Sequence, residues 1–270
     1  MYSFDRMERS RGAPDNGVRF TVLGPLEVLR DGKDYAPSTP KVLQLLAVLM
    51  MHPGKMVHID TLIRELWSDN PPRTVRTTLH TYVYHLRRCI EQNELAADPD
   101  KMLATRQSGY ILHIDPAQVD VHEFDRLHQI GNDRQDADDH EAAVEAYRAA
   151  LGLWSGQPLA NLHCGPILSA YRTRLLESQR TVLHLRIEAE IVSGRHRELI
   201  GELRSLATGS PLDETLHGQL MKVLGRSGRR SDAMAVYRRL RSRLAGELGV
   251  EPCDDIQLLH RELISEGDHR

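Results

Sequence analysis

The segment RTVRTTLHTYVYHLRRC, residues 73–89, carries side chains suited to contact a polyanion. It contains four arginines and four threonines, and no Asp or Glu occurs between Arg73 and Ile90. Threonine is a mediocre helix former because it is branched at Cβ, so helix propensity alone does not explain its repeated use on a helix. Its hydroxyl can meet a phosphate or a base edge, and its methyl group can contact the thymine methyl. The segment therefore predicts a helix whose outer face lies in a DNA major groove.

A helical wheel separates this segment into two faces. Apolar residues recur at intervals of four and three and form the predicted core stripe: Val75, Leu79, Val83, Leu86 and Ile90. The opposite face presents Thr77, Thr81, Tyr84 and Arg88, flanked by Thr74, Thr78 and His85. A solvated helix face usually mixes both signs of charge, whereas a face that approaches phosphates must exclude carboxylates.

The arginines near this helix divide into three groups. Arg73 and Arg76 lie at its N-terminal end, where base contacts of helix-turn-helix proteins concentrate, so we expect them to read or clamp DNA. For Arg87 and Arg88, a phosphate contact and a favourable charge near the helix C-terminus are equally good explanations. Arg106, in TRQSGY, lies at the tip of a predicted hairpin and is expected to enter an adjacent minor groove.

The elements around this helix predict a small α+β domain. FTVLGPLEVLRDGKDY (20–35) reads as an antiparallel sheet with a tight turn at Asp31-Gly32. A helix with Pro40 in its first turn is predicted next, and it ends at Pro53-Gly54. A second helix is predicted over HIDTLIRELW and ends at Asn70-Pro71-Pro72. After the helix of residues 73–90 come a polar loop at 92–101 and a hairpin around Ser108-Gly109. A sheet, three helices and a terminal hairpin predict a winged helix-turn-helix.

The second half of the chain predicts only helices, with a boundary near Asp115-Pro116. Gly194-Arg195 and Gly228-Arg229 recur at a spacing of 34 residues, the period of a tetratricopeptide unit. Small and aromatic residues one turn apart, Ala143 with Tyr147 and Ala233 with Tyr237, suit close helix packing. The alternative is an irregular helical bundle in which glycine merely ends helices.

Composition limits the class of protein. The chain is 40% hydrophobic and 27% charged and has no apolar run long enough to span a bilayer, so we expect no membrane partner. The net charge of −3 is uneven, with +2 on residues 1–114 and −5 on residues 115–270. The polar residues 1–17 lack a signal-peptide core and predict a disordered tail and a cytoplasmic, nucleoid-associated protein. The scattered Cys89, Cys164 and Cys253 fit reduced thiols.

Two other classes of protein compete with a DNA-binding protein. An enzyme is disfavoured because the 14 histidines form no HExxH string and no paired nucleophile and base, so no catalytic, metal-ligating or cofactor-binding residue is assigned. The second alternative is a peptide-binding scaffold of helical repeats, which gives no reason to keep one helix free of acids. Binding to promoter fragments that depends on sequence and survives moderate salt distinguishes the two.

The order of these elements, with TVRTTLHTYVYHLRR, SGYIL and the later GLWSGQPL, resembles the Streptomyces antibiotic regulatory protein family over residues 18–263. The resemblance implies an OmpR-type winged-helix DNA-binding domain over residues 18–114. It implies a bacterial transcriptional activator domain, tetratricopeptide-like and all-α, over residues 115–270. The expected fold is therefore an α+β winged helix-turn-helix domain followed by an all-α tetratricopeptide-like helical domain.

The same resemblance implies a transcriptional activator of a secondary-metabolite gene cluster that binds direct repeats near the −35 promoter element. Two protomers would lie side by side on the DNA and recruit RNA polymerase, including its sigma factor. No receiver domain is present, so phosphorylation by a two-component system is not expected. Larger relatives add an ATPase module, whose phosphate-binding string GxxxxGKS or GxxxxGKT does not occur here, so the chain is either a short form or continues past Arg270.

The family pattern assigns DNA contacts to Arg76, Thr77, Thr78, Thr81, Tyr82, His85, Arg87 and Arg106. The wheel supports most of these, but it places Tyr82 at the edge of the core, where a packing role is equally expected. Together with the wheel, the predicted DNA-binding residues are Arg73, Arg76, Thr77, Thr78, Thr81, Tyr82, Tyr84, His85, Arg87, Arg88 and Arg106.

Overall fold

The computed structural model describes residues 17–265, which form two compact units. The N-terminal unit consists of residues 17–122 together with Trp154–Leu175, and the helical unit of Glu123–Leu153 together with residues 176–265. The predicted tail is outside the described residues except for Gly17. The N-terminal unit is larger than the segment 18–114 expected for the DNA-binding domain, because it includes residues from much later in the chain.

The N-terminal unit begins with the predicted antiparallel sheet. Its strands are β1 (Arg19–Thr21), β2 (Glu27–Arg30) and β3 (Lys33–Asp34), hydrogen-bonded in the order β1-β2-β3. The turn between β2 and β3 places Asp31 and Gly32 at φ values of 51° and 75°. Two successive positive φ values suit Asp-Gly and give the twist of a hairpin turn, as the sequence predicts.

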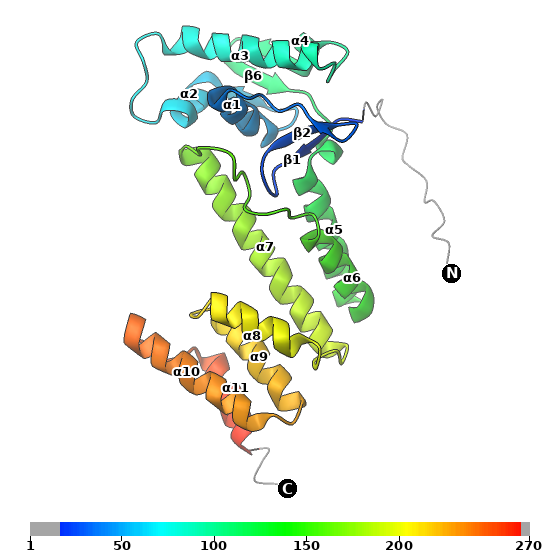
Figure 1. Cartoon of the computed structure of the whole chain (residues 1–270), viewed down its shortest axis with the longest axis vertical. Coiled ribbons are helices and arrows are strands. Elements are labelled where there is room, and N and C mark those ends of the chain that lie inside the picture. Colours follow the sequence, from blue (N-terminus) through cyan, green and yellow to red (C-terminus); the bar gives the residue numbers. More distant parts are fainter. Residues whose placement is uncertain (1–16, 266–270) are drawn as a thin grey trace, which may run out of the picture. The chain divides into compact units, whose positions relative to one another are not determined.

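A helix-turn-helix and a winged hairpin follow (Figure 1). The helices are α1 (Pro40–Met50), α2 (Ile59–Trp67), α3 (Val75–Gln92) and the short α4 (Pro99–Met102). The strands are β4 (Met56–His58), β5 (Leu103–Arg106) and β6 (Gly109–Leu112), in the order β4-β6-β5. β4 is not predicted from the sequence, since three residues are too short to show alternation, and α4 lies in the expected loop 92–101. Glycine is needed at 109 because a Cβ there would lie 2.1 Å from the carbonyl oxygen of Val57.

A segment remote in sequence completes the N-terminal unit. Ser155 N donates to Leu23 O at 3.1 Å, and Leu159 N donates to Gly24 O at 2.6 Å. The amide of Asn161 pairs with both backbone groups of Leu26, at 2.8 and 3.0 Å. The GLWSGQPL string therefore starts a segment that satisfies the backbone of the loop between β1 and β2.

The helical unit contains antiparallel helix pairs joined by short turns. Its helices are α5 (Asp120–Asp136), α6 (His140–Leu151), α7 (Pro166–Val192), α8 (Leu199–Gly209), α9 (Glu214–Arg226), α10 (Arg230–Leu248) and α11 (Asp254–Ser265), where α5 and α7 begin in the N-terminal unit. Gly194 and Gly228, at φ values of 81° and 73°, lie in the turns from α7 to α8 and from α9 to α10. The 34-residue spacing thus marks two equivalent turns, as the tetratricopeptide pattern predicts. No helix within residues 17–265 has the length and apolarity needed to cross a membrane.

The predicted small and aromatic pairs are buried in this unit. Ala143 and Tyr147 on α6 are fully buried, and a Cβ at Gly131 on α5 would lie 2.3 Å from the ring of Tyr147. The Tyr147 hydroxyl donates to Asn132 Oδ1 at 2.8 Å. Glycine at 131 thus lets α5 and α6 approach closely around a buried tyrosine whose hydroxyl is hydrogen-bonded.

Candidate nucleic-acid interface

Helix α3 is held in the N-terminal unit by the predicted apolar stripe. Leu79, Val83, Leu86 and Ile90 are all at most 2% exposed, while Val75 in the first turn is half-buried. Helix period alone then places the opposite face in solvent. The helix starts at Val75 rather than at Arg73, so Arg73 lies on the exposed chain that leads into it.

The exposure of the predicted site residues divides them into two sets. Those on the surface are Arg73, Arg76, Thr77, Thr81, Tyr84, His85, Arg88 and Arg106. Those partly buried are Thr78, Tyr82 and Arg87. The exposed set on α3 contains no carboxylate, because the nearest acid along the chain is Glu91 in the last turn.

Two threonine hydroxyls of this face are bonded to the helix itself. Thr78 Oγ1 donates to Thr74 O, and Thr81 Oγ1 donates to Thr77 O, each at 3.1 Å. This bond back to the preceding turn fixes the rotamer of each side chain. The oxygens keep lone pairs for a donor such as an adenine or cytosine amino group, and a bond to a phosphate requires the hydroxyl to rotate away from the helix.

Arg76 lies beside a carboxylate of the neighbouring helix α2. Its Nη2 is 3.8 Å from Asp60 Oδ1 on α2, and the two side chains are 70% and 87% exposed. An ion pair of this length and exposure is worth little, so the guanidinium is free to exchange Asp60 for a phosphate or a guanine.

Arg87 binds within the unit. Its Nε and Nη2 donate to Leu103 O at 3.1 and 2.6 Å, Nη2 also donates to Thr105 Oγ1 at 2.9 Å, and Nε lies 3.0 Å from Asp100 Oδ1. These contacts join α3 to the first strand of the wing. The guanidinium thus fixes the position of the hairpin relative to the helix.

Two aromatic residues of α3 have different surroundings. Tyr82 stacks on Trp67 of α2 with ring centroids 5.8 Å apart and planes 12° apart, so it joins the two helices of the helix-turn-helix. Tyr84 is 54% exposed, and its hydroxyl accepts a hydrogen bond from Arg88 Nη1 at 3.4 Å. This bond raises the pKa of Arg88 above its usual value.

Arg106 lies on the exposed tip of the wing. It ends β5, pairs in register with Gly109 of β6, and is followed by the two-residue turn Gln107-Ser108. Its guanidinium donates only to the neighbouring carbonyl of Thr105, at 3.1 Å, among the contacts of the described residues. The hairpin therefore presents a cation that contributes nothing to the packing of the unit.

The exposed face also includes His80, which the sequence analysis does not select. His80 is exposed on α3 near Thr77 and Thr81, and its ring meets that of Tyr110 edge-on at 6.5 Å. We call the exposed face of α3 around Thr77, Thr81, Tyr84 and Arg88 the reading face. The helical wheel places His80 on its flank, so the spacing of His80 from Thr77 and Thr81 could have identified it from the sequence.

Two family models together match most of the chain. Residues 33–112 match the family described as transcriptional regulatory protein, C terminal. Residues 119–264 match the bacterial transcriptional activator domain. The first match covers α1 to β6, including α3 and the wing, and the second covers α5 to α11 almost completely.

Individual relatives also match most of the chain. The chain is 35% identical over 253 residues to regulatory protein DnrI of Streptomyces peucetius, covering 92% of each protein. It is 33% identical to regulatory protein AfsR of Streptomyces coelicolor, over 97% of this chain but only 25% of AfsR. The solved structure of Mycobacterium tuberculosis EmbR in complex with a low-affinity phosphopeptide superposes with a TM-score of 0.87 at 32% identity, over 93% of this chain and 65% of that one. With an OmpR-type winged helix, an activator domain and these relatives, the chain belongs to the Streptomyces antibiotic regulatory protein family of DNA-binding transcriptional activators.

Proposed function

We propose that this protein activates a secondary-metabolite gene cluster by binding direct repeats near the −35 element of its promoter. Two protomers bind side by side on the repeats, each with α3 in a major groove and the wing in the adjacent minor groove. The helical unit supports contacts between protomers and presents a surface to RNA polymerase, including its sigma factor. The site of action is the cytoplasm, on the nucleoid.

The observation that carries this proposal is the acid-free exposed face of α3 together with the exposed cation of the wing. Thr81 projects from the helix side opposite the buried Leu79, and Arg76 is exposed on the flank of the buried stripe. Arg106 lies at the tip of a hairpin that Arg87 ties to the same helix. A helix and a hairpin held in fixed relation match the spacing of two adjacent grooves better than two independent loops would.

From their contacts within the unit, we infer different roles for the predicted residues. Arg73, Arg76, Thr77, Thr81, Tyr84, His85, Arg88 and Arg106 are proposed to contact DNA. Arg87 and Tyr82 are proposed as positioning residues, since their side chains already bind β5 and Trp67. Thr78 is half-buried at the edge of the face and is proposed to contact the sugar-phosphate backbone.

Footprinting of the full chain on the upstream regions of neighbouring genes tests the proposal. Protection is expected on direct repeats spaced by about one helical turn, the separation that places two protomers on one side of the duplex. A single protected half-site, or protection independent of sequence, would contradict the arrangement.

Alanine substitutions on α3 and the wing test whether the proposed residues contribute to specific DNA binding. Arg76→Ala should weaken specific binding by about ten- to a hundred-fold, the loss expected for one base contact of roughly 1–3 kcal/mol. Arg19→Ala removes one positive charge from an exposed position on β1 and serves as the control. If Arg76→Ala, Thr81→Ala and Arg106→Ala all bind the footprinted fragment like the control, α3 and the wing do not form the reading surface.

Transcription in vitro tests the activator half. The full chain should increase transcript from the footprinted promoter with purified polymerase holoenzyme. Binding without activation would leave DNA recognition in place and remove the proposed contact with polymerase.

A further inference from the structure

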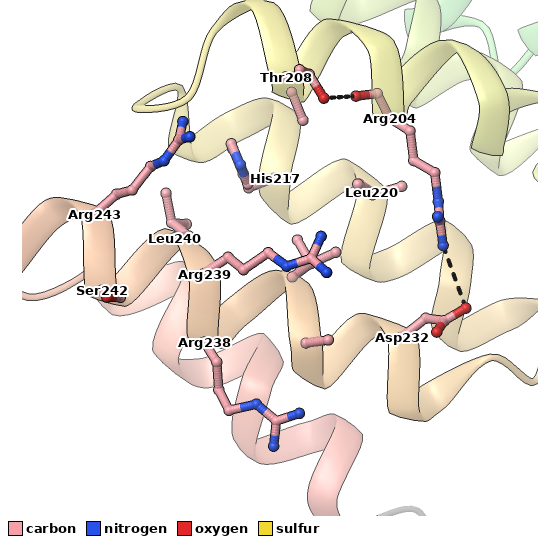
Figure 2. A pocket seen from close by; sticks show the side chains of 13 residues that line it. Arg204, Thr208, His217, Leu220, Asp232, Arg238, Arg239, Leu240, Ser242 and Arg243 are labelled. Carbon is pink, nitrogen blue, oxygen red and sulfur yellow. Dashed lines mark hydrogen bonds and ion pairs between the residues drawn. The ribbon is translucent and has the colours of Figure 1, made fainter.

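A groove opens between α8, α9 and α10 of the helical unit. It encloses about 980 Å³. Ala207, Leu220 and Leu240 support it from below and are 7%, 3% and 0% exposed, while the half-buried Ala235 and Val236 of α10 expose apolar surface on its floor. Figure 2 shows the side chains of Leu220 and Leu240 and the ring of His217 between the helices, with longer side chains around them. The floor is therefore apolar and preformed by the packed core.

The rim of the groove is basic. Arg204 comes from α8, and Arg239 and Arg243 come from α10; all three are exposed. In Figure 2 Arg239 extends across the groove, and Arg243 rises beside His217, whereas Arg238 extends toward the bottom of the view, away from His217. From Ala233 to Gly246, α10 carries four arginines and no carboxylate, although residues 115–270 as a whole have a net charge of −5. Local enrichment in arginine against the charge of its surroundings indicates a surface for an anionic partner.

The carboxylate at the rim of the groove is already paired with other arginines. Asp232 is the single carboxylate among the described residues that line the groove, and Arg229 donates to it from Nε at 2.8 Å. Arg204 reaches the same carboxylate at a longer 3.4 Å. Within residues 17–265 neither Arg239 nor Arg243 has a carboxylate within salt-bridge distance. Arg241 on the same helix, by contrast, is paired with Glu251 at 2.6 Å.

The combination of floor and rim discriminates between anionic partners. Guanidinium groups bind carboxylates through two parallel hydrogen bonds, and arginine is enriched where interfaces bind most strongly. A nucleic-acid backbone would satisfy the rim but would leave the exposed apolar surface of Ala235 and Val236 without an apolar partner. A peptide with carboxylates on both sides of a bulky apolar residue satisfies both, and the concave sides of helical repeats commonly bind extended segments.

We propose that this groove binds an acidic segment of a partner protein, with an apolar side chain of the segment on Ala235 and Val236 and its carboxylates on Arg204, Arg239 and Arg243. This binding goes beyond the proposed DNA recognition and does not rest on it.

Fluorescence anisotropy on the full chain tests the groove. The probe is a fluorescein-labelled peptide with a Leu-Phe pair flanked on each side by Asp and Glu. A second peptide has Asn and Gln in place of the acids, and a third has Ser in place of Leu-Phe. The acidic peptide should bind at least about ten-fold more tightly than either, because each comparison peptide lacks one half of the match.

Two double variants with the same change of net charge locate the binding. Arg239→Gln/Arg243→Gln should weaken the acidic peptide by about ten-fold or more. Arg241→Gln/Arg261→Gln removes two exposed arginines of α10 and α11 outside the groove and should change binding by less than about two-fold. Both variants should footprint the promoter like the wild type, which separates this test from that of the proposed function.

Three results would overturn the proposal. Equal binding of the acidic and amide peptides would show that the arginines do not select carboxylates. Equal loss in both double variants would show a general effect of charge. Loss of non-specific DNA affinity in Arg239→Gln/Arg243→Gln, with peptide binding unchanged, would assign the groove to nucleic acid.

Discussion

The carboxylate of Glu65 on α2 closes the N-terminus of the helix that begins one residue after Gly165. Glu65 Oε1 accepts a hydrogen bond from Gly165 N at 2.6 Å, and Oε2 accepts from Ile167 N at 2.7 Å. Glu65 is 1% exposed, and Gln44 Nε2 donates to Oε1 at 3.1 Å. A buried carboxylate is tolerated there because it faces the first N–H groups of α7, which need acceptors and carry the positive end of the helix dipole. The first helix of the helix-turn-helix thereby caps the helix that continues into the activator domain.

Glu65→Gln should lower the free energy of unfolding of the N-terminal unit by roughly 1–3 kcal/mol, because an amide NH2 would face a backbone N–H that the carboxylate now satisfies. Urea unfolding followed by tryptophan fluorescence measures this, since both tryptophans, Trp67 and Trp154, belong to that unit. Glu94→Gln removes a carboxylate that is 82% exposed and should change stability by less than about 0.5 kcal/mol. Equal stability of the two variants would mean that the cap contributes nothing.

Gly165→Ala should destabilise the same unit, because a Cβ at this position would lie 2.2 Å from Glu65 O. Relief requires α2 or the start of α7 to move, at a cost of roughly 1–3 kcal/mol. Gly201→Ala is the contrasting variant: its Cβ meets nothing within 4 Å in α8, so better helix propensity should add up to about 1 kcal/mol. Thermal unfolding followed by far-ultraviolet circular dichroism should therefore shift in opposite directions. A shift in the same direction would contradict the contact at Gly165.

Helix period explains why the reading face of α3 follows from the sequence. The buried stripe from Leu79 to Ile90 and the exposed Thr77 and Thr81 depend on residues three and four apart, so a local pattern determines both. The Asp31-Gly32 turn is equally local, because it needs two residues that tolerate positive φ.

Contacts between remote residues leave no such pattern. Glu65 and Asn161 look like ordinary surface residues in the sequence, and each binds backbone groups at least 100 residues away. From the sequence Arg87 is a cation near the end of a helix. Its hydrogen bond to the backbone of β5 depends on where that strand packs, which the sequence does not reveal. The predicted domain division after residue 114 likewise follows chain order, while the compact N-terminal unit takes up Trp154–Leu175 through hydrogen bonds to the β1-β2 loop.

Arg87→Ala and Arg88→Ala should separate positioning from DNA contact. Loss of the Arg87 guanidinium leaves Leu103 O without its donor and should cost the N-terminal unit roughly 1–3 kcal/mol in urea unfolding. Arg88 is exposed and bonds only weakly to Tyr84, so Arg88→Ala should change stability by less than about 0.5 kcal/mol and weaken binding to the footprinted fragment. If instead Arg87→Ala unfolds like the wild type and loses only DNA affinity, Arg87 contacts DNA directly, as the family pattern implies.

Asp120, the first residue of α5, should make the stability of the N-terminal unit depend on pH. Its carboxylate accepts hydrogen bonds from Val22 N and Leu23 N at 2.9 and 3.0 Å. Burial raises the pKa of this carboxyl from 3.8 to about 6, against the backbone N–H groups, which act to lower it. A pKa raised by folding means that the folded state holds the proton more tightly than the unfolded chain. The contribution to stability is therefore present below about pH 4 and is lost as the pH rises to about 6.

Comparison with Asp120→Asn isolates this contribution from the other titrating groups. Between about pH 4 and pH 6 the free energy of unfolding of the wild type should fall relative to that of the variant, by at most roughly 3 kcal/mol, and the difference should then stay constant. Urea titrations followed by tryptophan fluorescence at several pH values measure it. A relative stability that rises over this range would show that the hydrogen bonds from Val22 and Leu23 outweigh burial and hold Asp120 ionised, with a pKa below its usual value.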